Sequence, residues 1–475
     1  MATAERKPKE APMQVGQKRM SLRSSGKRLI DLGLLYVSKS GAIIVGLLIL
    51  PFFSRQLGPD LFGVVALILS LQSFLILLDF GMATMVGREL AIVQATDSQR
   101  YITWRAAEWL VSALYLGISP LALLIPTLLG SPWGVVEVLS CVILFWALTL
   151  QNIGQNALFA RRKFSEAAIV QLFGLLARHG VTAIALVCVG ASLTSFIISQ
   201  SAVAVVQMLV TRWRCNLDLC THSEERFSVG VRTHAAAMLR RGRALMLFGL
   251  AGAAVLQLDK VIVSVFMSPR ELGPYFLATT FCLAPISVLA APVAQFFQPR
   301  LVQALSSENP AAVQLTLNQF IASITACSLL PTALIWLLRE PLIALWLQDG
   351  NDVAQVAHYS SVLLPGVAIG ALGYIPYSML IAKQDYGFQA RLSLALTAVT
   401  LTAVMISAIH SSVFAICLVY ALYHSVSTIC SWWRCTRIDA TVGNIAAAGA
   451  LYASILVSLL FSVVVFFAAI AAHFN

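Results

Sequence analysis

The sequence predicts an all-α polytopic membrane protein built of two six-helix bundles, with an additional transmembrane helix at the C-terminus. Hydrophobic residues make up 59% of the 475 positions and charged residues only 11%. The apolar residues come in blocks of about 20 separated by short polar breaks, as helices that cross a bilayer require. Roughly a quarter of the residues of a soluble chain are charged, so large water-soluble domains are excluded.

Thirteen apolar blocks are long enough to cross a bilayer. They lie near residues 31–53, 61–86, 107–129, 134–158, 167–189, 193–211, 244–266, 275–297, 314–338, 354–381, 389–409, 412–433 and 444–471. Because this count is odd, the two ends of the chain are expected on opposite sides of the membrane.

The distribution of Lys and Arg predicts the orientation. With the N-terminus inside, the cytoplasmic segments hold 26 of the 32 Lys and Arg, and the opposite side holds only Arg55, Arg270 and Arg339. Positively charged segments remain on the cytoplasmic side, so this bias predicts a cytoplasmic N-terminus. The net charge of +11 then reflects topology and membrane contact. Nucleic-acid binding is not expected, because it would need a folded basic surface.

The blocks divide the chain into five parts. These are a disordered basic tail (1–28), an N-terminal six-helix lobe (29–211), a basic cytoplasmic linker (212–243), a C-terminal six-helix lobe (244–433) and one further transmembrane helix (434–475). The tail is too polar to fold alone, and no small-residue cleavage site follows it, so we interpret the first span as a signal anchor. Its lysines are expected to contact anionic membrane lipids.

A pentapeptide occurs twice, as RQLGP at 55–59 and as RELGP at 270–274. One copy follows span one and the other follows span seven, so each is predicted to form the outer turn of a helical hairpin. Gly tolerates positive φ after a helix, and Pro starts the next one. Because six spans per half is an even number, both halves enter the membrane in the same direction. We therefore expect a pseudo-twofold axis along the membrane normal.

The sequence predicts neither a metal site nor a disulfide bond. The nine cysteines and seven histidines show no CxxC, HExxH or similar spacing. All nine cysteines are expected in spans or cytoplasmic loops, where they stay reduced. No cofactor is predicted.

Three stretches carry a resemblance to a known family. They are SRQLGPDLFGVVALILSLQSFLILLDFGMATMVGRELA at 54–91, ALFARRKFSEAAIVQLFG at 157–174 and LDKVIVSVFMSPRELGPYFLATT at 258–280. The first resembles the first hairpin of bacterial polysaccharide flippases of the Wzx type, within the multidrug/oligosaccharidyl-lipid/polysaccharide exporter superfamily. The second resembles their connector between spans four and five, and the third the start of their second half. The resemblance covers about residues 28–435, and the thirteenth span departs from the family's usual even count.

The resemblance implies a transport function and not an enzyme. It implies two lobes around a central cavity that opens alternately to either side of the bacterial inner membrane. The cargo would be a polyprenyl-pyrophosphate-linked oligosaccharide repeat unit for surface polysaccharide biosynthesis. A polysaccharide polymerase and glycosyltransferases of the same pathway would be further partners.

Three cations fall inside predicted spans, where a buried charge costs at least roughly 2.5–3.5 kcal/mol and needs a reason. Lys39, Arg178 and Lys260 are candidates to bind an anionic pyrophosphate in a wet cavity. Each also has a structural alternative: Lys39 snorkels or pairs with Asp31, and Arg178 joins a hydrogen-bond network near His179. Lys260 follows Asp259 directly, but adjacent helix positions do not share a face, so the two charges need not neutralise each other.

Amides and carboxylates supply the other candidate site residues. In QNIGQNALF, Gln151 lies above Gln155 and Asn152 lies above Asn156, because positions i and i+4 share a helix face. These amides suit either sugar hydroxyls or helix packing. The carboxylates Asp79 and Asp259 are candidates for coupling to a proton or sodium gradient, and uncoupled movement stays open. Asp79 is alternatively an interfacial or helix-pairing residue.

Proline marks the candidate gating helices. Pro285, Pro292 and Pro299 recur every seven residues in and beyond span eight, so any bends they cause accumulate on one face. PGVAIGALGYIP at 365–376 is expected to weaken span ten in the same way. Both stretches are candidates for gating, and packing is the alternative reading.

Two other classes of function were weighed against a lipid-linked oligosaccharide flippase. A drug or small-molecule cation antiporter of the same superfamily would favour an acidic, aromatic-lined cavity, whereas the deepest charges are mostly positive. A membrane enzyme such as a polymerase or glycosyltransferase usually needs a sizeable catalytic loop. The largest predicted outer loop is REPLIALWLQDGNDVAQ, and no carboxylate pair or metal triad stands out.

Overall fold

The described part of the chain is entirely helical. The computed structural model describes residues 14–77, 79, 81–90, 96–129, 134–161, 163–219, 227–306, 309–348, 352–383, 385–438 and 440–474, with the side chains of α1 described from residue 41 on. The helices are α1 (Gln14–Leu77), α2 (Met82–Leu90), α3 (Asp97–Leu129), α4 (Val135–Ala160), α5 (Phe164–Cys188), α6 (Leu193–Leu219), α7 (Phe227–Phe266), α8 (Pro269–Ser306), α9 (Pro310–Ile324), the π-helical turn η1 (Thr325–Leu329), α10 (Leu330–Leu337), α11 (Arg339–Leu347), α12 (Val353–Leu372), α13 (Tyr374–Ala382), α14 (Tyr386–Ile409), α15 (Val413–Cys435) and α16 (Ala440–Phe474).

The helix lengths fit a protein that crosses a membrane many times. Within the described residues, 11 helical segments are long and apolar enough to span a bilayer. One of them, Ile43–Ile76, contains a non-helical residue, Gly58, at φ 72° and ψ 171°. This positive φ suits glycine, and the following Pro59 is preorganised to start a helix, so α1 consists of two helices joined by a tight turn. The first RQLGP turn is therefore confirmed.

The second pentapeptide does not form the turn itself, and this part of the prediction was wrong. RELGP lies inside the first turns of α8, and the chain turns earlier, at residues 267–268. The reason is a capping box: the backbone N–H and the hydroxyl of Ser268 each donate a 3.0 Å hydrogen bond to Glu271 Oε2. With Pro269 at the first helical position, the helix starts before the pentapeptide is reached.

The two hairpins pack against each other at one end of the molecule. A Cβ atom on Gly63 would lie 1.9 Å from the carbonyl oxygen of Pro269, so only glycine allows this approach. The rings of Phe62 and Phe276 meet edge to face with centroids 6.5 Å apart. We call this the hairpin end, defined by residues 55–60 and 267–274.

An ion pair crosses the same contact. Arg270 donates hydrogen bonds of 2.8 and 3.0 Å to the two carboxylate oxygens of Asp60. Both side chains are more than 60% exposed, and an exposed pair contributes about 0–1 kcal/mol. Close packing at Gly63 therefore holds the hairpins together more than the charges do. Arg55 and Arg270, the first residues of the two pentapeptides, thus both make specific protein contacts.

Helix α11 closes over the hairpin end. It occupies most of the stretch that was expected to be the largest outer loop. The indole N–H of Trp346 donates a 2.9 Å hydrogen bond to the carbonyl oxygen of Leu47 in α1, and Arg55 donates to the side chain of Gln348. The second half of the chain thus contacts the first half at three places on this end.

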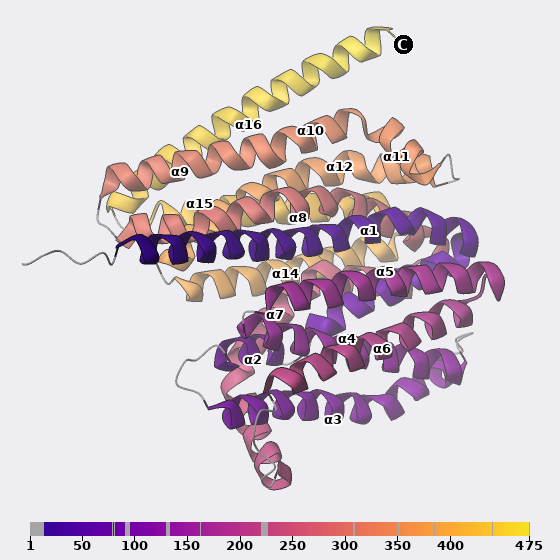
Figure 1. Cartoon of the computed structure of the whole chain (residues 1–475). Coiled ribbons are helices and arrows are strands. Elements are labelled where there is room, and N and C mark those ends of the chain that lie inside the picture. The colour runs from indigo at the N-terminus through magenta and orange to yellow at the C-terminus, as the bar shows by residue number, and fades with distance from the viewer. Residues whose placement is uncertain are drawn as a thin grey trace, which may run out of the picture.

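The helices form two groups that α1 and α7 connect (Figure 1). Helices α2 to α6 pack on one another in the lower part of the view, and α8 to α16 pack in the upper part. Helix α7 contacts α3, α1 and α14, and Thr103 of α3 is hydrogen-bonded to His234 in the first turns of α7. Residues 212–219 end α6 and residues 227–243 begin α7. Most of the predicted linker 212–243 is therefore helical, as the end of α6 and the start of α7, and not a loop. Residues 220–226 lie outside the described residues.

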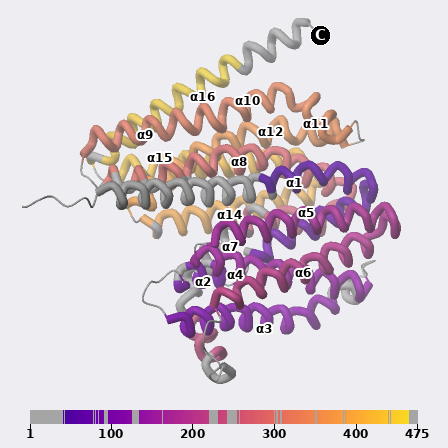
Figure 2. The backbone as a smooth tube through the Cα atoms, in the orientation of Figure 1, coloured from indigo at the N-terminus to yellow at the C-terminus, as the bar shows by residue number. Residues whose placement is uncertain are grey.

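The C-terminal segment is helical as expected. Helix α16 packs on α9 and α10 at the edge of the upper group, as the tube trace shows (Figure 2). At the other terminus, α1 starts at Gln14, inside the segment expected to be a disordered tail; residues 1–13 lie outside the described residues.

Helical breaks occur at one of the two predicted places. The predicted weak stretch of span ten is divided into α12 and α13 at Gly373, where Thr428 Oγ1 donates a 3.3 Å hydrogen bond to the carbonyl oxygen of Ile369 on the preceding turn. Helix α8 is continuous from Pro269 to Ser306 through Pro285, Pro292 and Pro299.

A cavity of about 250 Å³ lies under the hairpin end. Asp352, Arg55 and Ser54 line it, together with Gly58 and the chain around it. Burial raises the pKa of the Asp352 carboxyl above its usual 3.8, and a hydrogen bond with Ser54 partly offsets this. The neutral carboxyl is thus favoured while the hairpin end is closed.

Gly63→Ala should open the hairpin end. The added methyl group would overlap the Pro269 carbonyl, and such overpacking costs about 1–3 kcal/mol. We expect nitroxide labels on the exposed positions Gln56 and Val265 to move apart in double electron–electron resonance, with the exposed Cys188 and Cys327 replaced by serine. Gly117→Ala, whose methyl meets no atom within 4 Å, is the matched control. An unchanged distance distribution would show that the close approach does not hold the two hairpins.

The closed hairpin end should lose stability as the pH rises from 3.8 to the raised pKa of Asp352, and stay constant above it. Over that window the opened state ionises its carboxylate while the closed state stays protonated. The same two labels should report a growing open fraction across this range. Asp352→Asn should remove the dependence, because the amide does not titrate; a pH dependence that persists in this variant would assign the effect to another group.

Candidate functional site

A small polar cavity lies between the last turns of α1 and the helices α4, α5 and α6. Its volume is about 180 Å³. Polar side chains from four helices converge on it, and we name it the amide–arginine cavity after them: Gln72, Gln151, Asn152, Gln155, Gln171, Arg178 and Gln207. Four of the seven residues that the sequence analysis selected for substrate binding thus line one space.

Arg178 is the only ionisable residue among those lining the amide–arginine cavity. Its side chain is 8% exposed, and its Nε and Nη1 atoms have no hydrogen-bond partner in the described structure. Nδ1 of the neighbouring His179 lacks one as well. The alternative role of Arg178, in a buried hydrogen-bond network with His179, is therefore not what the described part of the chain shows.

Unsatisfied amide oxygens face the same cavity. Of 16 buried side-chain polar atoms without a partner in the described residues, five belong to the amide–arginine cavity: Oε1 of Gln72, Gln151 and Gln171, with Nε and Nη1 of Arg178. Donors and acceptors lie around one space without bonding to each other. Buried polar groups nearly always have a partner, so this arrangement calls for water or a polar ligand between them.

A glycine in α5 allows a glutamine of α6 to pack against it in the cavity wall. A Cβ atom on Gly174 of α5 would lie 2.0 Å from the amide of Gln207, so glycine is what lets the α6 glutamine pack there. Gln207 donates a 3.1 Å hydrogen bond from Nε2 to the carbonyl oxygen of Val170, which fixes its direction. Asn156 is used locally: its Nδ2 donates to the backbone and side-chain oxygens of Asn152, at 2.9 and 3.3 Å.

Lys260 and Asp259 form a buried pair in the second half of the chain. Lys260 Nζ lies 2.9 Å from Asp259 Oδ2, with side chains 4% and 0% exposed. The two charges therefore do neutralise each other, although they are adjacent in sequence, because the long lysine side chain folds back over the helix. The hydroxyl of Tyr275 donates a 2.5 Å hydrogen bond to the same carboxylate oxygen, and Asp259 Oδ1 has no described partner.

Two tyrosines flank this buried pair. The Lys260 ammonium lies 5.7 Å from the ring centroids of Tyr275 and Tyr420, which come from α8 and α15. The Tyr420 hydroxyl donates to the carbonyl oxygen of Val255, one turn earlier on α7. Lys260 is thus held inside the second group of helices and does not line the amide–arginine cavity.

Asp79 starts a helix. Span two was expected to continue to residue 86, but α1 ends at Leu77 and α2 begins at Met82. The buried carboxylate of Asp79 accepts hydrogen bonds from the N–H groups of Gly81 at 2.8 Å and Ala83 at 2.7 Å. This is N-cap geometry, and Gly81 at φ 71° completes the turn.

The remaining candidate residues, one lysine and three prolines, lie in helices α1 and α8. Lys39 lies in α1 at a position whose side chain is outside the described residues. Pro285 and Pro292 are half-buried in α8, and the side chain of Pro299 is likewise outside the described residues. Within the described chain, no group of three His, Cys, Asp or Glu could hold a metal ion.

Sequence reasoning missed three cavity residues, Gln72, Gln171 and Gln207. Each is an amide inside a predicted apolar span: Gln72 is the one amide of its span, Gln171 lies seven residues before Arg178, and Gln207 shares its span with Gln200. Polar side chains inside spans are costly, so an isolated glutamine there marks either helix packing or a cavity.

Comparisons with known proteins place the chain in a fold and a family. By sequence, no curated protein matches it. The lipid II flippase MurJ, in an inward closed conformation, superposes with a TM-score of 0.70 at 11% identity, covering 93% of this chain and 99% of that one. An inward-facing multidrug resistance MATE family transporter of the MOP superfamily gives 0.68 at 13% identity over 90% and 99%. The eukaryotic MATE transporter AtDTX14 gives 0.60 at 12% over 90% and 99%. The chain therefore shares its fold with MurJ and with MATE family transporters.

The sequence profile of one family, described as polysaccharide biosynthesis protein, matches residues 52–354. This range holds the first hairpin, the amide–arginine cavity, the buried ion pair and the closed hairpin end. The chain therefore belongs to the polysaccharide biosynthesis protein family.

Proposed function

We propose that the protein moves a polyprenyl-pyrophosphate-linked oligosaccharide repeat unit from the cytoplasmic to the outer leaflet of the bacterial inner membrane by alternating access. The observation that carries the proposal is the amide–arginine cavity, in which a buried guanidinium and three amide oxygens have no partner among the described residues. A pyrophosphate supplies the missing anion. Sugar hydroxyls both donate and accept, as the amides do.

The size of the cavity limits what it takes up. At about 30 Å³ per water molecule, 180 Å³ corresponds to about six waters. This suits a hydrated phosphate group or the first sugar, and not a complete repeat unit. We therefore assign the cavity to the pyrophosphate end of the substrate, and the remainder of the glycan to space that opens between the two groups of helices.

The proposed topology has thirteen spans. The 11 segments found in the described chain become thirteen when Ile43–Ile76 is divided at Gly58 and α7 is added. Six spans form each of two lobes related by a pseudo-twofold axis, with α16 as an extra helix. The bias of Lys and Arg puts the N-terminus and the basic end, which carries Arg100, Arg161, Arg212 and Arg434, in the cytoplasm. The hairpin end is then the closed outer gate.

Fold and family support this substrate class to different degrees. A lipid II flippase shares the fold, and the family takes part in polysaccharide biosynthesis. MATE transporters share the fold as well, so a drug or small-molecule cation antiporter is the alternative. The charge of the site argues against it, because a cation would have to approach the unpaired guanidinium of Arg178.

We further propose that Asp259, rather than Asp79, couples transport to a proton or sodium gradient. Both oxygens of Asp79 are used in capping α2, whereas Asp259 keeps one oxygen without a described partner beside Lys260.

We also propose that helices bend at their prolines and breaks as the gate opens. These sites are Pro285, Pro292 and Pro299 in α8 and the break at Gly373. Lys39 is proposed as a second cation for the substrate from α1.

Replacing Arg178 should impair transport without impairing insertion. Arg178→Gln removes the charge but keeps the size and polarity, and loss of a charge-assisted hydrogen bond costs about 1.5–3 kcal/mol, or roughly ten- to hundredfold in substrate affinity. The readout is transfer of a fluorescent polyprenyl-pyrophosphate-linked disaccharide in proteoliposomes. Arg178→Lys should retain part of the activity, and Arg391→Gln, on the exposed surface of α14, should retain all of it.

Cells provide the second readout for the same residue. Lipid-linked repeat units should accumulate on the inner leaflet when Arg178→Ala and Lys39→Ala are combined at native expression level. Full surface-polysaccharide production by that double variant would contradict the cation role. Transfer of a cationic dye in place of the pyrophosphate lipid would favour the antiporter.

Separating the buried pair should distinguish structure from coupling. Lys260→Met leaves a buried carboxylate without its partner, which costs about 3–5 kcal/mol, whereas Lys260→Met with Asp259→Asn should recover most of that stability. Thermal unfolding in detergent measures the first effect. We expect the double variant to transport without dependence on an imposed gradient.

Asp79→Asn is the comparison for the coupling role. It should lose about 1 kcal/mol through the weakened helix cap and keep its gradient dependence. Gradient dependence that is lost in Asp79→Asn and retained in the Asp259 variant would reverse the assignment.

A further inference from the structure

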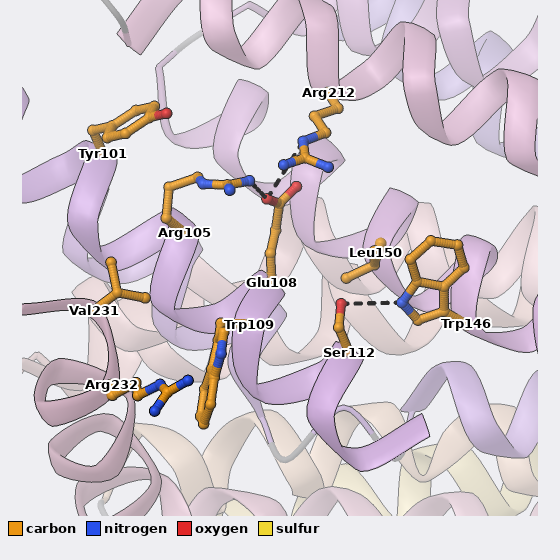
Figure 3. A pocket seen from close by; sticks show the side chains of 10 residues that line it. All are labelled: Tyr101, Arg105, Glu108, Trp109, Ser112, Trp146, Leu150, Arg212, Val231 and Arg232. Carbon is orange, nitrogen blue, oxygen red and sulfur yellow. Dashed lines mark hydrogen bonds and ion pairs between the residues drawn. The ribbon is translucent and has the colours of Figure 1, made fainter. Parts of the chain in front are cut away.

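A second, larger cavity lies at the basic end, apart from the amide–arginine cavity. Its volume is about 540 Å³, and it is bounded by α3, α4, α6 and the first turns of α7 (Figure 3). Arg105, Arg212 and Arg232 come to it from three different helices, and Trp109 forms part of its wall. We call it the arginine cavity. None of its lining residues was selected in the sequence analysis.

The arginine cavity carries an excess of positive charge. Glu108 is the only carboxylate that lines it. Arg105 donates a hydrogen bond to this carboxylate, and Arg212 Nε lies 3.7 Å from the same oxygen, so both guanidinium groups converge on one anion (Figure 3). Arg232 makes no ion pair with a described residue. Three guanidinium groups against one carboxylate leave a net charge of about +2.

Arg232 is held in place by an aromatic ring and not by an acid. Its Cζ atom lies 5.5 Å from the ring centroid of Trp109, in a cation–π arrangement that leaves its N–H groups available. The first turns of α7 are also tied to α3 by a 3.1 Å hydrogen bond between Thr103 Oγ1 and His234 Nε2. The third arginine is thus built into the site by tertiary contacts.

The surface next to the cavity is apolar and faces outward. Trp109 is 40% exposed, and Leu116, seven residues later on the same face of α3, is 76% exposed. A ligand with a phosphate at the arginines and a hydrocarbon chain over Trp109 and Leu116 would satisfy both surfaces. A free phosphate would use only the first.

We propose that the arginine cavity binds a phosphate-bearing anion, and that the adjoining apolar face of α3 selects the headgroup of an anionic phospholipid as its source. Arginine suits this role because its planar fork binds two phosphate oxygens at once. Basic pockets between helices at the cytoplasmic side are where such headgroups bind. The bound lipid would join α3 of the first helix group to α7, which continues into the second. This binding does not depend on what the protein transports.

The test measures lipid binding to the full-length protein in neutral detergent. Native mass spectrometry and thermal unfolding are followed during titration with phosphatidylglycerol, with phosphatidylcholine of the same acyl chains, and with inorganic phosphate. We expect phosphatidylglycerol to bind and to raise the unfolding temperature, and the other two to do neither. Arg212→Gln combined with Arg232→Gln should weaken phosphatidylglycerol binding at least about tenfold. Arg391→Gln is the matched control.

Single variants separate binding from folding. Arg232→Gln removes a guanidinium without an ion pair in the described chain, so it should fold normally and still bind phosphatidylglycerol more weakly. Trp109→Leu should weaken the phospholipid further by removing the support of Arg232. Wild-type phosphatidylglycerol affinity in Arg232→Gln and in the double variant would overturn the proposal. Inorganic phosphate that competes at equal concentration would overturn the lipid as the source.

Discussion

The cost of leaving a polar group without a partner inside a membrane is the constraint on which the site depends. Each unsatisfied group in hydrocarbon costs several kcal/mol, and a charged one costs more. Arg178 has two buried nitrogens without partners, and three glutamine oxygens around it are in the same state. A helix bundle keeps such a set only if something polar occupies the space between them. The cavity is therefore the means by which these side chains are tolerated, and the proposed ligand, an anion that carries hydroxyl groups, would supply the partners that they lack in the described structure.

The two halves of the chain treat buried charge in opposite ways. In the second half, Lys260 and Asp259 neutralise each other, and Tyr275 donates to the same carboxylate oxygen. In the first half, Arg178 has no acidic neighbour among the residues that line its cavity. Of the cations selected from the sequence, Arg178 therefore lines the amide–arginine cavity and Lys260 does not. Adjacent positions diverge by about 100° around a helix, but the four methylene groups of Lys260 are long enough to bring its ammonium to Asp259. Burial favours this arrangement because it pairs the two charges.

Sequence signals predicted those parts of the fold that depend on interactions between residues close together in the chain. Apolar blocks located the membrane helices, and Gly58 with Pro59 located the first turn, because span length and positive φ depend on few neighbours. RELGP misled because Ser268, two residues before the pentapeptide, forms a capping box with Glu271 and starts the helix sooner. Asp79 was recognised as unusual, but its cap depends on a helix break that apolar periodicity does not reveal. Gln72 and Gln207 lie 106 and 29 residues from Arg178, so only tertiary packing brings them to it, whereas Gln171 lies seven residues away on the same helix.

The hairpin end is closed by contacts that are individually weak. The exposed pair of Asp60 and Arg270 adds about 0–1 kcal/mol, and a neutral hydrogen bond such as that of Trp346 adds about 1 kcal/mol. A gate of this strength can be opened by a ligand that binds the open state a few kcal/mol better. An anion that reaches Arg178 offers such a difference, because the guanidinium passes from unpaired to paired. In the proposed mechanism, pairing of the buried Arg178 supplies the free-energy difference, and the weak contacts of the hairpin end respond to it.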